Sequence, residues 1–118
     1  MSRIGIYIVT VALVAGAVAG PAGAASKPTV SITNPGDCQA ITYRWSSFSK
    51  ARTAELRIHH FGVFETSRSL GPVAASGSFT MPADVVFVPG DQYTVLGVLL
   101  DSGNRAINPS GAAWWGTC

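Results

Sequence analysis

Residues 88–104 read VPGDQYTVLGVLLDSGN, and this stretch decides the fold class. Side chains of residues 92–100 alternate between two faces, and both faces are largely apolar. Such a strand is typical of the centre of a sheet that is covered on both sides. The sequences PGD before it (89–91) and DSGN after it (101–104) are rich in turn-forming residues. The stretch therefore predicts a central β-strand between two turns.

The residues around this strand show the same rhythm of short alternating segments and turns. No window of a dozen residues beyond the N-terminal region keeps apolar side chains at helical spacing. We therefore predict an all-β fold, a single sandwich of about seven strands. Further strands are predicted at 27–33, 38–46, 54–64, 77–81, 85–88 and 112–118, with a short edge strand at 68–70. Alternation places on the inner face Gln39, Ile41, Tyr43, Trp45, Leu56 and Ile58.

The first 24 residues have the pattern of a secretory signal peptide. Arg3 is their only charged residue, residues 4–19 are apolar or small, and residues 22–24 read AGA. Because a signal peptidase inspects small residues at such an exit, we predict cleavage after Ala24 and a secreted, extracellular product. A transmembrane anchor is the alternative, but a bilayer requires about 20 apolar residues and residues 20–21 (GP) interrupt the run. We thus divide the chain into a signal peptide (1–24) and a β-sandwich domain (25–118), with no membrane partner after cleavage.

The two cysteines of the chain are Cys38 and Cys118. An exported chain with an even number of cysteines usually pairs them all, which predicts one disulfide. The bridge would close a loop of about 80 residues and stabilise the fold by at most about 4–5 kcal/mol. The spacing lacks the CxxC pairs of a zinc site, so no metal and no cofactor are expected.

Two stretches resemble the fibronectin type III and immunoglobulin-like domains. Residues 88–104 are similar to that family's run of an apolar residue, Pro-Gly, two polar residues, Tyr and alternating apolar residues. The resemblance implies a tyrosine corner, in which the Tyr93 hydroxyl bonds the backbone a few residues upstream and Val88 is the apolar corner residue. Residues 41–46 (ITYRWS) resemble the family's second strand, which implies that Trp45 is a core residue. The same topology brings the start of the second strand and the end of the seventh to one pole, where the two cysteines could meet.

Enzymatic function is not expected from this sequence. It has no G-x-S-x-G nucleophile elbow, and its acidic residues fall mostly in turns. His59 and His60 are adjacent, so on a strand they point to opposite faces and cannot chelate one ion. A net charge of only +2 gives no clustered basic surface for nucleic acid.

Exposed aromatic and charged side chains are the candidate ligand contacts. Trp114 and Trp115 are adjacent on a predicted strand, so one faces the core and the other solvent, where it could stack on a sugar or anchor a protein. Arg44 lies between two aromatic residues, and Phe61 and Phe64 flank the bend at Gly62. The competing interpretation of each aromatic residue is ordinary core packing.

The leading hypothesis is a secreted, non-catalytic binding module for an extracellular protein or a surface glycan. A small hydrolase inhibitor, against an amylase or a protease, is one alternative. Secreted actinobacterial amylase inhibitors are β-sandwiches with a Trp-Arg-Tyr triplet, which is similar to residues 43–45 (YRW) in reverse order. A carbohydrate-binding module that uses the solvent-facing tryptophan is the other alternative.

Overall fold

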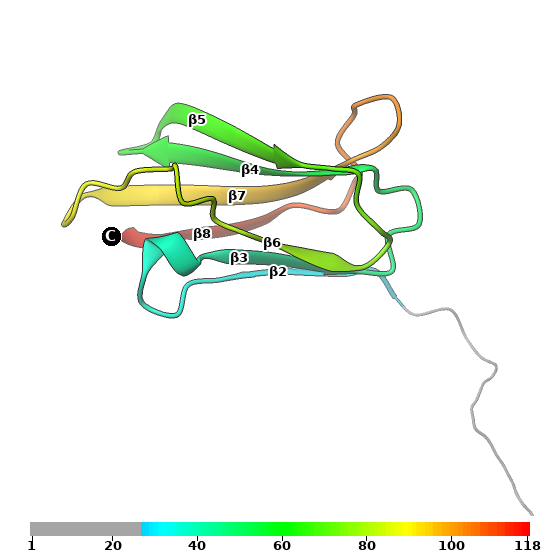
Figure 1. Cartoon of the computed structure of the whole chain (residues 1–118), viewed down its shortest axis with the longest axis horizontal. Coiled ribbons are helices and arrows are strands. Elements are labelled where there is room, and N and C mark those ends of the chain that lie inside the picture. The colour runs from blue at the N-terminus through cyan, green and yellow to red at the C-terminus, as the bar shows by residue number, and fades with distance from the viewer. Residues whose placement is uncertain (1–26) are drawn as a thin grey trace, which may run out of the picture.

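The computed structural model describes residues 27–118, so the predicted signal peptide and its cleavage site lie outside the described residues. These residues form seven strands in two antiparallel sheets (Figure 1). One sheet has three strands in the order β2-β3-β6, and the other has four in the order β5-β4-β7-β8. The strands are β2 (Thr29–Thr33), β3 (Thr42–Ser46), β4 (Thr53–His60), β5 (Val63–Leu70), β6 (Gly77–Thr80), β7 (Gln92–Leu100) and β8 (Ala112–Thr117). The prediction of an all-β fold with two sheets is confirmed.

Strand β7 has the bounds and the central position that its apolar sequence predicts. It pairs with β4 on one side and β8 on the other, and its inner-face residues are fully buried. Gly97 sits in the middle of that face because the ring of Tyr43, from the other sheet, fills the space where a side chain would be. A Cβ added to Gly97 would lie 2.3 Å from Tyr43 Cδ1. The two sheets therefore pack closely together at this pair.

The core between the sheets contains the inward residues that alternation predicts on β3 and β4. Tyr43 and Trp45 are buried and lie in tilted contact, with 5.5 Å between ring centroids. The Tyr43 hydroxyl donates a hydrogen bond to the Ser110 carbonyl at 2.5 Å, and the Trp45 indole donates one to the Ala74 carbonyl at 3.0 Å. Both polar tips are thus satisfied inside an apolar core.

The predicted strand at 38–46 is shorter than expected because its first residues form a helical turn. Asp37 accepts a hydrogen bond from the Gln39 backbone N–H with its side chain, which caps the 3-10 turn η1 (Cys38–Ala40). Strand β3 begins only after this turn. Gln39, expected on the inner face, is half-buried at the rim instead.

The predicted strand at 54–64 is two strands joined by a tight hairpin. Phe61 and Gly62 both have positive φ, 50° and 79°, as a two-residue type I′ turn requires. The chain then returns as β5, which is much longer than the expected edge strand at 68–70. Positive φ is uncommon in a residue other than glycine, and Phe61 is such a residue. The sequence therefore indicated only a bend at Gly62 and not a two-residue turn.

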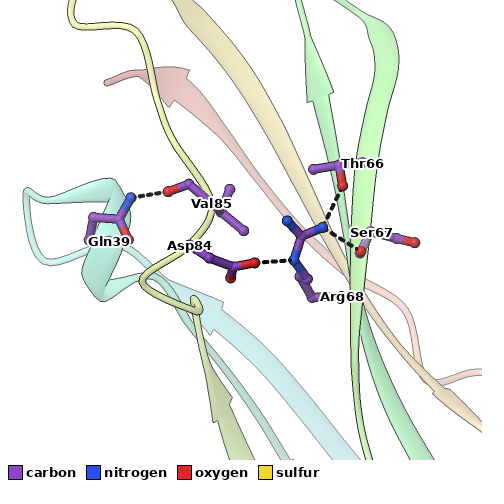
Figure 2. Close-up of polar contacts among 6 residues, drawn as sticks. All are labelled: Gln39, Thr66, Ser67, Arg68, Asp84 and Val85. Atoms are coloured by element: carbon purple, nitrogen blue, oxygen red, sulfur yellow. Dashed lines mark hydrogen bonds and ion pairs between the residues drawn. The ribbon is translucent and has the colours of Figure 1, made fainter.

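The predicted strand at 85–88 is wrong, because this segment pairs with neither sheet. Val85 N–H bonds back to the Pro82 carbonyl in a turn, while the Val85 side chain is buried in the core. Figure 2 shows how the segment is held between the sheets: Gln39 donates to the Val85 carbonyl, and Asp84 accepts from Arg68 Nε of β5 at 3.1 Å. Arg68 also donates to Thr66 Oγ1 and to the Ser67 carbonyl. The segment therefore closes the side of the sandwich between β5 and β6.

The tyrosine corner and the disulfide are both present. The Tyr93 hydroxyl accepts a hydrogen bond from the Val88 backbone N–H at 2.8 Å, five residues upstream. Cys38 and Cys118 are bonded, with 5.8 Å between their Cα atoms. The bridge joins η1, which leads into β3, to the residue that follows β8, so it ties the two sheets together at one pole. Figure 1 places the C-terminus beside η1 at that pole.

Candidate functional site

The outer face of the four-stranded sheet carries a row of side chains that crosses all four strands. Strand register places Phe64 of β5 opposite His59 of β4, His59 opposite Thr94 of β7, and Thr94 opposite Trp115 of β8. We call these four residues the aromatic row. Neighbouring strands are about 4.8 Å apart, so the two ends of the row lie roughly 14 Å from each other.

Both ends of the aromatic row are open to solvent. Trp115 is 71% exposed and Phe64 is 55% exposed. The Phe64 ring meets the His59 ring edge to face, with 5.6 Å between centroids, so it is held in position beside the middle of the row. His59 and Thr94 are half-buried and supply polar atoms between the two apolar ends.

A β-bulge puts Phe64 on this face. Register shifts by one residue between Ile58 and His59, and Glu65 is the extra residue on β5. Without the shift, Glu65 would lie opposite His59, and Phe64 would point toward the inner side. The bulge therefore creates the aromatic row.

The displaced Glu65 carboxylate helps to fix the end of the β4–β5 hairpin. His60 Nδ1 lies 3.2 Å from Glu65 Oε1, and His60 Nε2 lies 2.9 Å from Asp91 Oδ2. The imidazole is also stacked between Tyr93 and Phe61, with centroid distances of 4.3 and 4.9 Å. His60 thus anchors the hairpin and positions Phe61, which is 63% exposed at its tip.

A shallow apolar pocket adjoins the aromatic row on the same face. Its volume is about 270 Å³. The next cross-strand row, formed by Arg57, Leu96 and Ala113, lines it together with Val98. Arg57 Nη2 is 2.8 Å from Glu55 Oε1, which holds the guanidinium along the sheet. The pocket therefore combines an aliphatic floor with a positioned cation.

Among the described residues, two groups have clearly shifted pKa values, and both lie away from this face. Burial raises the pKa of Tyr43 to about 12, and the Ser110 side chain acts in the opposite direction with a smaller effect. Backbone N–H donation, chiefly from Arg105, lowers the pKa of Asp101 in its exposed turn. Among residues 27–118, no three His, Cys, Asp or Glu side chains gather as metal ligands.

The five candidate contacts from the sequence separate into three groups. Trp115 and Phe64 form the two ends of the aromatic row, and Phe61 is exposed nearby at the tip of the β4–β5 hairpin. Trp114 points inward and packs against the core, so the expected inward–outward split of the tryptophan pair is confirmed. Arg44 is exposed on the outer face of the other sheet.

Sequence reasoning missed the residues in the middle of the site. Alternation put Arg57 on an outer face and put Thr94 and Leu96 together on one face of their strand, but nothing indicated that these three residues would face the same way as Phe64. Strand order and the bulge supply that information, and neither has a clear signal in one sequence.

Comparison with known proteins gives no relative. No family model, no curated protein and no solved structure matches this chain. Within residues 27–118, no helix has the length and apolar character needed to cross a membrane. The arrangement itself offers surface binding: stacking on two aromatic rings, with hydrogen-bonding groups between them.

Proposed function

We propose that this chain is an exported, non-catalytic binding module, and that it contacts an extracellular protein or a surface glycan with its aromatic row. The observation that carries the proposal is the alignment of two exposed aromatic rings, from different edges of one sheet, across a common face. Exposed aromatic side chains grouped in this way are typical of binding surfaces rather than of free surface.

The fold relationship that we propose is the fibronectin type III-like or immunoglobulin-like sandwich. The hydrogen bond from Val88 N–H to the Tyr93 hydroxyl supports it, because that contact is the family's tyrosine corner. Seven strands divided between two antiparallel sheets support it as well.

Export is supported by the disulfide. Structural disulfides persist in oxidising compartments, and in this chain one bridge joins both sheets. The apolar sequence of residues 4–19 and the AGA exit at 22–24 support a signal peptide.

A binding assay on the secreted protein tests the proposal. The protein is presented to a panel of insoluble polysaccharides and, separately, is titrated into amylase and protease reactions. We expect retention by a glycan, or inhibition at stoichiometric concentrations, that falls at least about tenfold in Phe64→Ala and in Trp115→Ala. Arg44→Ala is the matched control, because Arg44 is exposed on the opposite outer face. Binding that Arg44→Ala abolishes and the aromatic variants keep would contradict the assignment of the site.

Intact mass of the secreted protein tests export and oxidation together. We expect the mass of residues 25–118 and no alkylation of cysteine without prior reduction. A mass that includes residues 1–24, or two alkylated thiols in the unreduced sample, would contradict the proposal that the protein is exported and oxidised.

A further inference from the structure

The outer edge of β8 is an unpaired strand edge. Cys118 N–H bonds the Asp91 carbonyl, which continues the β7–β8 register and fixes which backbone groups face β7. In an antiparallel ladder these groups alternate along the strand, so the N–H and C=O groups of Ala113, Trp115 and Thr117 point away from β7. Outside the sheet ladder, no hydrogen bond among residues 27–118 uses these groups. β8 therefore offers three donor–acceptor pairs for another strand.

This edge lacks the features that protect the other edge of the same sheet. β5 carries the bulge, the charges of Glu65 and Arg68, and the segment that Asp84 ties against it. β8 reads AAWWGT, with no charge, no proline and no bulge. Proteins normally block such an edge, because an open one recruits further strands.

We infer that the edge of β8 pairs with β8 of a second copy of this chain. The edge is self-complementary about Trp115, because the outward groups of residues 113, 115 and 117 are evenly spaced around it. A two-fold axis at Trp115 would place Ala113 opposite Thr117 of the second copy and form about six backbone hydrogen bonds. The absence of charge on β8 means that no like charges meet across the axis.

Pairing at this axis also brings the exposed tryptophans of the two copies into contact. The side chains of Ala113, Trp115 and Thr117 all lie on the outer face, so the two Trp115 rings become directly opposed neighbours between small residues. The two four-stranded sheets then form one sheet of eight strands, with the aromatic rows of both copies in a single line. β2 of the other sheet lies near β8 without hydrogen-bonding to it, so the second copy must approach in the plane of the four-stranded sheet.

The expected association is weak, because one short strand edge buries less surface than a permanent dimer interface. Sedimentation velocity of the secreted protein between about 10 µM and 1 mM should show a monomer–dimer equilibrium. Ala113→Pro removes an outward N–H and leaves the β7 bonds intact, so it should weaken dimerisation by more than about tenfold. Ser69→Pro is the matched control, because by register its N–H faces outward from β5 at the other edge.

A second pair of variants covers the case in which Ala113→Pro fails to fold. Trp115→Lys places two like charges opposite each other at the axis, whereas Phe64→Lys adds the same charge at the far end of the same row. Loss of the dimer in Trp115→Lys but not in Phe64→Lys supports the inference. A protein that stays monomeric at 1 mM overturns it, as does a dimer that survives both β8 variants or is lost in all four.

Discussion

The two outer faces of this sandwich differ although they cover one core. Tyr43, Trp45 and Phe79 of the three-stranded sheet point inward, as Leu56 and Val95 of the other sheet do. Outward, the three-stranded sheet presents hydroxyl side chains around Arg44, and these are Thr29, Ser31, Thr33, Thr42, Ser46, Ser78 and Thr80. The four-stranded sheet instead presents the aromatic row and the aliphatic floor beside it.

This difference separates the requirements of folding from those of binding. A face of hydroxyl groups is hydrated and internally bonded, for example by the 3.0 Å contact of Thr42 with Thr80, and it needs no partner. A face with exposed tryptophan and phenylalanine leaves apolar area in water. Because both faces sit on the same stable core, folding alone does not explain the second face.

The largest expected effect on stability comes from removing the disulfide that joins the two sheets. Replacing both Cys38 and Cys118 by alanine should lower the free energy of unfolding by up to about 4–5 kcal/mol, because the bridge closes a loop of about 80 residues. Urea denaturation of the oxidised protein and the double variant measures this. A difference below about 1 kcal/mol would mean that the sheets stay stacked without the bridge.

The next effect tests the close packing of Gly97 against Tyr43 of the other sheet. Gly97→Ala should destabilise the fold by about 3 kcal/mol, because the new methyl group would overlap the Tyr43 ring. Gly111→Ala is the control, since no atom lies within 4 Å of the Cβ built at Gly111. Equal denaturation midpoints for the two variants would show that Tyr43 can move aside.

A third effect depends on pH. Burial raises the pKa of Tyr43 to about 12, so the folded protein keeps the phenol proton where the unfolded chain, with a pKa near 10, releases it. Between these pH values the unfolded state binds fewer protons, and the free energy of unfolding should fall by about 2 kcal/mol as pH rises. Denaturation at pH 9 and pH 11.5 measures the decline. Tyr43→Phe should remove most of it, and an undiminished decline in that variant would assign it to other groups.

The smallest effect sharpens the contrast between the faces. Phe64→Ala, Trp115→Ala and Arg44→Ala should each change the free energy of unfolding by less than about 1 kcal/mol, because all three side chains are largely exposed. Thermal denaturation compares them with the wild type. A much larger loss in either aromatic variant would make that ring a structural residue rather than a binding one.

Sequence alone determines the parts of this fold that depend on local alternation. β7 was predicted with its bounds, the inward positions of Leu56 and Ile58 were correct, and Trp114 and Trp115 were correctly placed on opposite faces, although the sequence did not say which of them faces solvent. In each case a period of two, with turns at both ends, is sufficient information.

The wrong strand at 85–88 has a clear physical cause, because apolar alternation reports burial rather than backbone pairing. Val85 is buried and Phe87 packs against Tyr93, so residues 85–88 look like a strand. Their backbone nevertheless pairs with neither sheet, and the Val85 N–H bonds back to the Pro82 carbonyl. The aromatic row was missed for a related reason. Its assembly depends on the bulge at Glu65 and on strand order, which arise from tertiary pairing.

The disulfide has a mechanical consequence for a protein pulled at its ends. The described chain enters at one pole with β2, and Cys118 is covalently joined to Cys38 at the other (Figure 1). Tension applied between residues 27 and 118 therefore passes through residues 27–38 and then through the sulfur–sulfur bond. Only β2 can be peeled away, while the loop from 38 to 118, which includes the aromatic row, carries no load.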